Sequence, residues 1–364
     1  MRFPEFTEEW ETKLINDLAL VIGGGTPDTT IKSYWDGEIQ WFTPSEIGEN
    51  KYVDSSLRTI TEEGLNNSSA KLLPPNTILL SSRATIGECS LSLRECATNQ
   101  GFQSLISQKC NIDFLYYLIQ TKKKDLIRKS CGSTFLEISA NEVRKIQVSV
   151  PSDVEQQKIA ELLSLIDERI ATQNKVIEKL ESLIKGIRNN AMVKIKGNSV
   201  TLQEIADIYQ PQTIASTDLT EEGYLVYGAN GVIGKYHSYN HEKEQICITC
   251  RGNTCGTVNF TEPKSWITGN AMVINTDNYA KNVNKRYLFH YLSSINFSSI
   301  VSGSGQPQIV RQPLAKLKLI LPSPAIQNHI AGCLDAILAK IKNEQSLLQT
   351  LQMQKSCLLS QMFI

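Results

Sequence analysis

The fold is decided by the stretch from Val154 to Met192, which reads VEQQKIAELLSLIDERIATQNKVIEKLESLIKGIRNNAM. Its apolar residues recur at alternating steps of four and three, which is the period of a coiled-coil seam. The seam consists of Ile159, Leu163, Ile166, Ile170, Gln173, Ile177, Leu180, Ile184, Ile187 and Ala191. This pattern predicts one long helix that packs against a partner along its whole length.

A second stretch, from Ala325 to Phe363, carries the same pattern. Its seam consists of Ile330, Leu334, Ile337, Ile341, Glu344, Leu348, Leu351, Lys355, Leu358 and Met362. Each member lies 171 residues after its counterpart, as Leu334 lies after Leu163. A constant offset indicates an internal duplication. We expect the two helices to pair in antiparallel fashion about a pseudo-twofold axis.

The duplication continues upstream of the helices. CGSTFLEISANEVRKIQVSVPSDVEQQKIAELL (131–163) aligns without gaps on SGSGQPQIVRQPLAKLKLILPSPAIQNHIAGCL (302–334). Two earlier segments also have counterparts: ILLSSRATIG (78–87) resembles ICITCRGNTCG (246–256), and ATNQGFQSLI (97–106) resembles ITGNAMVI (267–274). The sequence therefore predicts four parts in the order lobe, helix, lobe, helix. Their ranges are 1–151, 152–196, 197–322 and 323–364.

Each lobe mixes strands with short helices, so the expected fold class is α/β with α+β lobes. Runs of apolar, β-prone residues predict strands at Thr77–Leu80, Ile146–Val150, Ile246–Thr249 and Lys316–Leu321. Short helices are predicted at Ile15–Val21, Phe114–Arg128, Leu202–Ile208 and Arg286–Leu292. Pro151 ends a strand and Ser152-Asp153 caps the first long helix, and Pro322-Ser323 repeat this arrangement.

The composition is that of an ordinary globular protein. Lys+Arg and Asp+Glu number 37 each, and 41% of the residues are hydrophobic. No apolar run approaches the roughly 20 residues that span a bilayer, and the acidic start MRFPEFTEEWE does not resemble a signal peptide. We expect a cytoplasmic protein. Its nine cysteines follow no framework spacing, so we interpret them as reduced thiols.

Known catalytic patterns fit poorly. Gly228-Ala-Asn-Gly-Val-Ile-Gly-Lys235 resembles a phosphate loop, but its spacing is wrong and Tyr236 replaces the hydroxyl that binds magnesium. Cys247, Cys250 and Cys255 suggest zinc, yet a fourth ligand at finger spacing is missing, and buried thiols are the simpler interpretation. A self-sufficient enzyme is therefore disfavoured, although one with a dispersed site stays an alternative.

The chain resembles the specificity subunit of type I DNA restriction-modification systems over nearly its whole length. The resemblance rests on GGGTPDTTIKSYWDGEIQWFTPSEI (23–47), on LPPNTILLSSRATIG (73–87) with ATNQGFQSLI, and on STFLEISANEVRKIQVSVPSDVEQQKIAELLSLIDERI (133–170) with its duplicated helix. Lobe 2, the segment 197–322, departs from this pattern. It has no GGTP segment and carries YGANG (227–231) and SGQPQ (304–308) instead.

This resemblance implies a non-catalytic subunit that recognises DNA. In the family, each of two target-recognition domains reads one half of a split sequence, and two antiparallel helices set the unread gap. The subunit carries two methyltransferase subunits, which use S-adenosylmethionine, and restriction subunits, which use ATP and Mg. The chain itself would bind no cofactor and no metal. A coiled-coil scaffold or inhibitor with the same fold but without DNA reading is the alternative.

Base edges are read by Arg, Asn, Gln and small hydroxyl side chains, which loops beside glycine can bring close to DNA. In the first lobe the candidates are Ser82, Arg83, Thr85, Asn99, Gln100, Ser133 and Thr134, together with the basic residues Lys122, Lys123 and Lys124. In lobe 2 they are Tyr227, Asn230, Lys235, Arg251, Asn253, Asn270, Ser304, Gln306 and Gln308. For each of them, a polar turn residue that bonds the local backbone is the alternative interpretation.

Charge is distributed unevenly along the first lobe. Residues 1–70 hold five Lys/Arg against 13 Asp/Glu, whereas residues 71–150 hold 11 against six. The densest basic cluster runs from Lys122 to Lys129, and a solvated helix face is its alternative interpretation. Because contacts with phosphates supply most non-specific affinity for DNA, a chain of zero net charge should bind DNA weakly without its partners.

Overall fold

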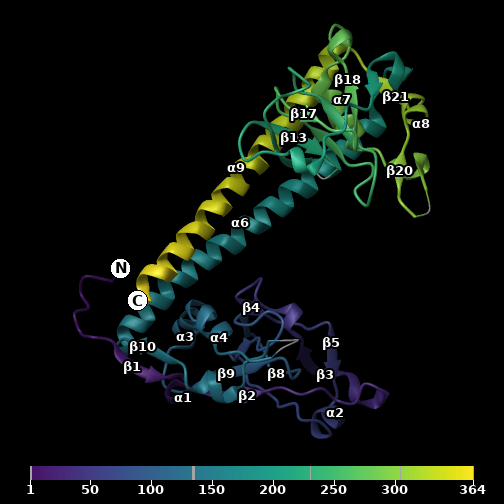
Figure 1. Cartoon of the computed structure of the whole chain (residues 1–364). Coiled ribbons are helices and arrows are strands. Elements are labelled where there is room, and N and C mark those ends of the chain that lie inside the picture. The colour runs from purple at the N-terminus through teal and green to yellow at the C-terminus, as the bar shows by residue number, and fades with distance from the viewer. Residues whose placement is uncertain (1, 133–135, 230, 304, 364) are drawn as a thin grey trace. The chain divides into compact units, whose positions relative to one another are not determined.

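A computed structural model describes residues 2–132, 136–229, 231–303 and 305–363 (Figure 1). The chain divides into unit 1, residues 1–174 with 347–364, and unit 2, residues 175–346. The division cuts both long helices, α6 (Asp153–Lys194) and α9 (Pro324–Met362). The units divide the chain differently from the four ranges predicted from the sequence, because each lobe packs against half of each helix.

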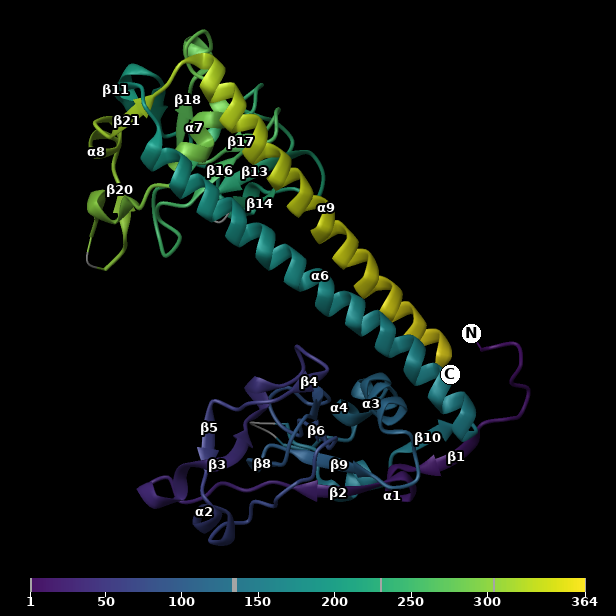
Figure 2. The same cartoon turned by 180° about the vertical axis from the view of Figure 1, so that it is seen from behind.

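Segments of α6 and α9 lie side by side within each unit (Figures 1 and 2). In unit 1, Lys355 Nζ lies 2.7 Å from Asp167 Oδ1. In unit 2, His290 bridges Arg188 of α6 and Asp335 of α9. Residue numbers therefore rise along α6 as they fall along α9, which confirms the antiparallel pairing. Every residue of both predicted seams is buried or partly buried, as the period of the sequence requires.

Lobe 1, the segment 1–151, contains two main sheets. The larger has the strand order β2 (Ala19–Gly23), β9 (Gln103–Ser107), β6 (Ile78–Leu80), β7 (Cys89–Ser92) and β4 (Tyr52–Val53). The smaller has the order β5 (Arg58–Ile60), β3 (Trp35–Phe42) and β8 (Cys96–Thr98), and β1 (Glu11–Leu14) pairs separately with β10 (Gln147–Val150). The α-helices are α1 (Ile15–Leu18), α2 (Glu62–Asn66), α3 (Ile112–Thr121), α4 (Lys123–Arg128) and α5 (Ala140–Arg144). Buried residues of α3 pack with β6 and with α6 in one core.

Lobe 2 repeats this architecture. Its larger sheet has the order β12 (Asp207–Tyr209), β18 (Ala271–Asn275), β15 (Ile246–Thr249) and β16 (Val258–Phe260). The smaller has the order β14 (Gly231–Tyr236), β13 (Tyr224–Gly228) and β17 (Trp266–Ile267). Two pairs are separate, β11 (Asn198–Thr201) with β21 (Lys318–Leu321), and β19 (Val301–Ser302) with β20 (Gln308–Ile309). The helices are α7 (Lys285–Leu292) and α8 (Arg311–Ala315).

The two lobes share one topology, which confirms the duplication. In both small sheets, the central strand pairs antiparallel with one neighbour and parallel with the other. The one strand of lobe 1 without a counterpart among the described residues is β4, which covers the edge of β7. It lies within the segment 43–57 between β3 and β5, whereas only two residues of the sequence separate β13 from β14.

A buried glutamine links each lobe to the first turns of its long helix. Gln156 Nε2 donates to Pro151 O at 2.9 Å, and its Oε1 accepts a hydrogen bond from Asn111 N at 2.9 Å. Gln327 repeats both bonds, to Pro322 O at 2.9 Å and from Asn284 N at 2.8 Å. Each amide thus joins the end of a strand, the start of a short helix and the long helix.

A second polar contact fixes α7 between the long helices of unit 2. His290 is fully buried on α7; its Nδ1 lies 3.0 Å from Arg188 Nη2 and its Nε2 lies 2.8 Å from Asp335 Oδ1. Burial lowers the pKa of His290 to about 4, although its hydrogen bond to Asp335 opposes that shift. A neutral imidazole can accept from Arg188 and donate to Asp335 at once.

Several local predictions need correction. The helix predicted at Ile15–Val21 ends at Leu18, because the following residues pair with β9 as strand β2. The helix predicted at Leu202–Ile208 is a short 3-10 turn, η3 (Leu202–Glu204), followed by β12. The helix predicted at Phe114–Arg128 is two helices that meet at Lys122. Within the described part of the chain, no helix combines the length and apolar character needed to span a bilayer.

We expect acid to lower the stability of unit 2 because it protonates His290. The imidazole takes up a proton more readily in the unfolded chain, at a pKa near 6.5, than in the folded one, at about 4. Its contribution to stability is therefore complete above about pH 6.5 and is lost as the pH falls toward 4, by at most about 1.4 kcal/mol per pH unit. Hydrogen exchange of α7, measured across this range, reports the loss.

The variant His290→Gln should show a shallower dependence on pH than the wild type. His329→Gln is the matched control, because His329 is exposed on α9. Equal slopes for the wild type and His290→Gln would contradict this prediction.

Candidate nucleic-acid interface

Three loops meet at one end of the sheets of lobe 1, and we name them loop cluster 1. They are Gly23–Pro27 after β2, Ser81–Thr85 after β6, and Asn99–Gly101 after β8. The backbone N–H of Ser82 donates to Gly101 O at 2.8 Å, and that of Gly25 donates to Thr98 O at 2.8 Å. Three of the segments that carry the resemblance in the first lobe are thus neighbours in space.

Glycine is required where the first loop meets the third. A Cβ atom at Gly24 would lie 2.0 Å from Asn99 O and 2.4 Å from Thr98 O, and these backbone atoms have no freedom to yield. Side chains then complete the junction. Asn99 Oδ1 accepts from Gly101 N at 2.8 Å, and Thr26 Oγ1 donates to Gln100 Oε1. The exposed amide of Gln100 is therefore held by a threonine that sequence reasoning did not select, although it lies in the quoted GGGTP segment.

Loop cluster 2 lies at the corresponding end of lobe 2, and its second and third loops are the counterparts of the second and third loops of loop cluster 1. It consists of Gly228–Ala229 after β13, Thr249–Cys255 after β15, and Thr268–Asn270 after β17. Cys250 N donates to Asn270 O at 3.0 Å. The hydroxyls of Thr249 and Thr254 both donate to Ala229 O, at 2.6 and 3.0 Å. This bond network joins the glycine-rich turn to the loop that carries Arg251 and Asn253.

Two backbone bonds recur in both clusters, and the first is the bond from Ser82 N to Gly101 O, which matches the bond from Cys250 N to Asn270 O. Ile138 N donates to Ser82 O at 3.1 Å, and Ile309 N donates to Cys250 O at 3.0 Å. Ser82 and Cys250 therefore occupy the same place in the repeat. A further segment borders each cluster, because Arg83 forms a β-bridge with Glu137 and Arg251 forms one with Gln308.

Most of the predicted residues lie on the surface of these loops or beside them. The exposed ones are Thr85, Gln100, Lys123, Lys124, Lys235, Arg251, Asn253, Asn270, Gln306 and Gln308. Arg83, Asn99 and Lys122 are partly buried. Four predicted residues, Ser133, Thr134, Asn230 and Ser304, lie outside the described residues.

Two predicted residues lie beneath the loops. The side chain of Ser82 is fully buried, and its hydroxyl has no hydrogen-bond partner in the structure. Tyr227 is buried, its hydroxyl accepts from Glu262 N at 3.0 Å, and burial raises the pKa of its phenol. Arg83 is also engaged, because its Nη2 lies 2.7 Å from Glu137 Oε2. In this structure, Ser82, Tyr227 and Arg83 therefore support the loops.

The basic cluster lies next to loop cluster 1. Gly87, two residues after Thr85, approaches Lys123 so closely that an added Cβ would lie 2.8 Å from its Cγ. Lys123 also pairs with Glu88, while Lys124 on the same helix is exposed. In lobe 2 the corresponding Gly256 lies beside Phe297, which is not charged. The two lobes therefore differ in charge at the same place.

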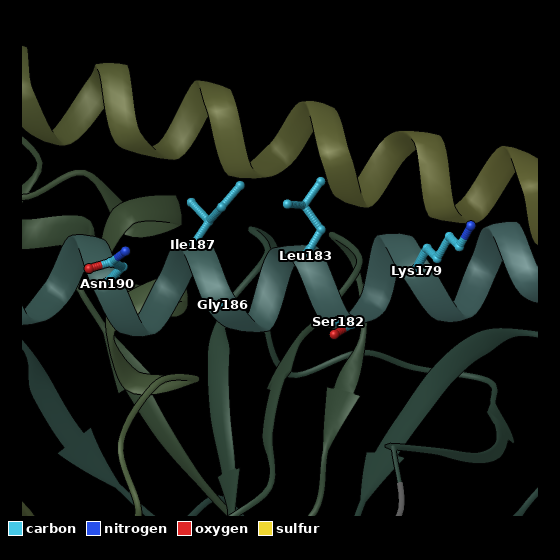
Figure 3. A pocket seen from close by; sticks show the side chains of 6 residues that line it. All are labelled: Lys179, Ser182, Leu183, Gly186, Ile187 and Asn190. Atoms are coloured by element: carbon cyan, nitrogen blue, oxygen red, sulfur yellow. The ribbon is translucent and has the colours of Figure 1, made fainter.

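A shallow hollow on α6 in unit 2 is lined by Lys179, Ser182, Leu183, Gly186, Ile187 and Asn190. Figure 3 shows Leu183 and Ile187 pointing toward α9, so the hollow is part of the surface of the paired helices. Within residues 2–132, 136–229, 231–303 and 305–363, no three His, Cys, Asp or Glu side chains are grouped to hold a metal ion. Burial raises the pKa of the Cys247 thiol to about 12.

Replacing Gly24 with alanine should disrupt loop cluster 1. We expect Gly24→Ala to lower the free energy of unfolding by about 1–3 kcal/mol, because the added methyl group overlaps backbone atoms. Amides of residues 98–102 should exchange faster. Gly186→Ala is the control, since nothing lies within 4 Å of its added Cβ on α6; it should stabilise the helix by up to about 1 kcal/mol. Equal behaviour of the two variants would count against the close approach.

Comparison with known proteins agrees with this duplicated architecture. A family model described as the type I restriction modification DNA specificity domain matches residues 7–182 and 195–353. The specificity subunit of the type I restriction enzyme MjaIX from Methanocaldococcus jannaschii is 39% identical over 181 residues, which are 48% of this chain and 42% of that protein. The EcoprrI specificity subunit from Escherichia coli is 28% identical over 339 residues, or 86% of this chain and 83% of that protein. The chain thus spans less than half of the first relative and most of the second.

Solved structures share the fold. A type I restriction-modification S subunit from M. genitalium has a TM-score of 0.67 at 17% identity, over 100% of this chain and 99% of that one. A chain from a structure that describes complex assembly and conformational transition of the type I R-M system has a TM-score of 0.59 at 15% identity, over 99% and 98%. At these low sequence identities, the similarity shows a shared fold alone. The family model matches most of the chain, in two segments that correspond to the two repeats, and the chain therefore belongs to the type I restriction-modification DNA specificity family.

Proposed function

We propose that the chain is the DNA-recognition subunit of a type I restriction-modification complex. Each lobe reads one half of a split target through its loop cluster. The observation that carries the proposal is the repeated set of backbone bonds that joins the same two loops and one bordering segment at one end of each lobe. A framework that occurs twice, with different exposed polar side chains on each copy, suits two half-sites of different sequence.

The charged and polar side chains support separate roles for different residues, some contacting bases and others contacting phosphates. Arg251, Asn253 and Asn270 are exposed on loop cluster 2 and offer the groups that read base edges. Helix α4 beside loop cluster 1 offers lysines, which suit phosphates. The chain has no net charge, so its own affinity for DNA should be low.

Partner subunits complete the complex in this proposal. Two methyltransferase subunits add the missing contacts with DNA and bind S-adenosylmethionine. Restriction subunits bind ATP and Mg. The chain supplies recognition and a scaffold rather than a reaction, and the length of its two helices determines the number of base pairs left unread between the half-sites.

A binding assay with and without the methyltransferase partner tests the proposal. Purified chain alone should bind duplex DNA weakly and lose that binding steeply as salt rises, whereas the assembly should bind its target tightly at physiological salt. Nanomolar binding of the target by the chain alone in physiological salt would refute the dependence on partners. An assembly that shows no preference among sequences would refute DNA recognition.

Substitutions should separate base contacts from phosphate contacts in the assembly. Arg251→Gln should cost about 1–3 kcal/mol at one base position, as expected when a bidentate contact with guanine is lost. Lys124→Gln should weaken binding to all sequences alike and reduce the salt slope by about one. Lys318→Gln is the matched control for charge, because Lys318 is exposed on β21. A uniform loss for Arg251→Gln would identify it as a phosphate contact instead.

A further inference from the structure

A fourth loop of lobe 2, residues 210–214, adjoins loop cluster 2. It follows β12, which pairs antiparallel with β18 at one edge of the larger sheet, as β2 pairs with β9 in lobe 1. The first loop of loop cluster 1 begins at the end of β2, so residues 210–214 occupy the corresponding place in lobe 2. The residue types differ, because this loop reads QPQTI where its counterpart reads GGGTP.

Gln210 attaches this loop to both segments that carry predicted base-reading residues of lobe 2. Its Nε2 donates to Gly269 O at 3.1 Å and to Cys250 Sγ at 3.1 Å. Asn270 directly follows Gly269 in the chain, and Arg251 directly follows Cys250. Because Cys250 is buried, the bond fixes the loop to the body of the lobe. Residues 210–214 therefore lie beside Arg251 and Asn270.

Further contacts fix the shape of the loop. Ile214 N donates to Thr268 Oγ1 at 3.2 Å. A Cβ atom at Gly269 would lie 2.5 Å from Thr213 Oγ1 and 3.0 Å from Pro211 O, so the two loops are in close contact. The ring of Pro211 also restricts its own backbone, with φ near about −65°. The backbone on both sides of residue 212 is thus held in place.

Gln212 is an exposed side chain at the centre of this fixed loop. Among the described residues its amide has no hydrogen-bond partner, in contrast to the amide of Gln210. Exposed glutamines are common on protein surfaces, and exposure alone indicates no function. Gln212 is different because its backbone is fixed beside Arg251 and Asn270. A fixed backbone reduces the entropy that is lost when the amide binds a ligand.

We propose that Gln212 reads an adenine in the half-site that lobe 2 recognises. A glutamine amide offers a hydrogen-bond acceptor beside a donor, and these match the N6 amino group and N7 of adenine in the major groove. A phosphate offers acceptors alone, so it would leave the amide oxygen of Gln212 unused. The inference rests on the proposed function and extends it to a further residue and a named base.

Replacing adenine with 7-deazaadenine in the target tests the inference, because this base lacks the N7 acceptor and keeps the N6 amino group. The target is first selected from a random duplex pool by the assembly of chain and methyltransferase partner. Each adenine is then replaced in turn, and the affinity is measured. We expect one adenine in the half-site of lobe 2 at which 7-deazaadenine weakens binding by about fivefold, the effect of losing one hydrogen bond to Gln212.

Two variants connect this response to the amide of Gln212. Gln212→Ala removes the amide, and Gln212→Glu keeps the length of the side chain but has no N–H to donate to N7. Each variant should bind the adenine and 7-deazaadenine forms of the target equally well at that position. Gln203→Ala is the matched control and should keep the full response. Gln203 is exposed on η3, which precedes β12 and so lies at the other end of that strand from residues 210–214.

The possible outcomes separate this inference from the proposed function. A half-site without adenine, or Gln212 variants that respond to 7-deazaadenine as the wild type does, would overturn the inference while leaving sequence-specific binding intact. A loss of affinity that is uniform over all sequences would overturn it by assigning Gln212 to the phosphates. Weaker assembly with the methyltransferase, with the response retained, would overturn it by assigning Gln212 to a protein interface. Binding without any sequence preference would instead refute the proposed function itself.

Discussion

The buried amides of Gln156 and Gln327 are the contacts on which the two-lobed architecture depends. Each satisfies a backbone N–H at the start of a short helix and a backbone carbonyl at the end of a strand, and each does so from the first turn of a long helix. Leaving such buried groups without partners costs about 1–3 kcal/mol each. A lobe therefore cannot turn freely on its helix, and the polar contact through His290 adds a second restraint in unit 2. Recognition of DNA by loops needs this rigidity, since a loop is only as well placed as the scaffold that carries it.

In the duplicated chain, the backbone framework that positions the loops is the same in both lobes, whereas the side chains on it differ. The bonds that recur in both clusters run between backbone atoms, so they survive the replacement of Ser82 by Cys250 and of Gly101 by Asn270 between the two lobes. The side chains above that framework are then free to differ. Lys123 and Phe297 occupy one such place beside Gly87 and Gly256, and they give one lobe a basic border and the other an apolar one. Two half-sites of different sequence are thus compatible with one repeated fold.

Much of the architecture could be predicted because long-range periodicity is visible in a single sequence. The seam from Ile159 to Ala191 and its copy predicted both helices and their direction. The aligned loops predicted equivalent positions for Arg83 and Arg251, which their β-bridges to Glu137 and Gln308 confirm. Short elements were less predictable, because tertiary pairing decides them: Ala19–Gly23 is a strand through its bonds to β9. Burial of Ser82 and the bond from Thr26 to Gln100 arise from segments far apart in the chain, so no local pattern indicates them. Neither does any pattern indicate β4, which has two residues.

The central claim is that one doubled chain determines which split sequence its complex acts on. Mapping of methylated adenines across the DNA of cells that carry the chain and its methyltransferase partner tests this claim most directly. We expect one motif made of two short blocks separated by an unread gap of constant length, and loss of methylation at that motif when the chain is removed. A motif without a gap, or methylation that persists unchanged in cells lacking the chain, would contradict it.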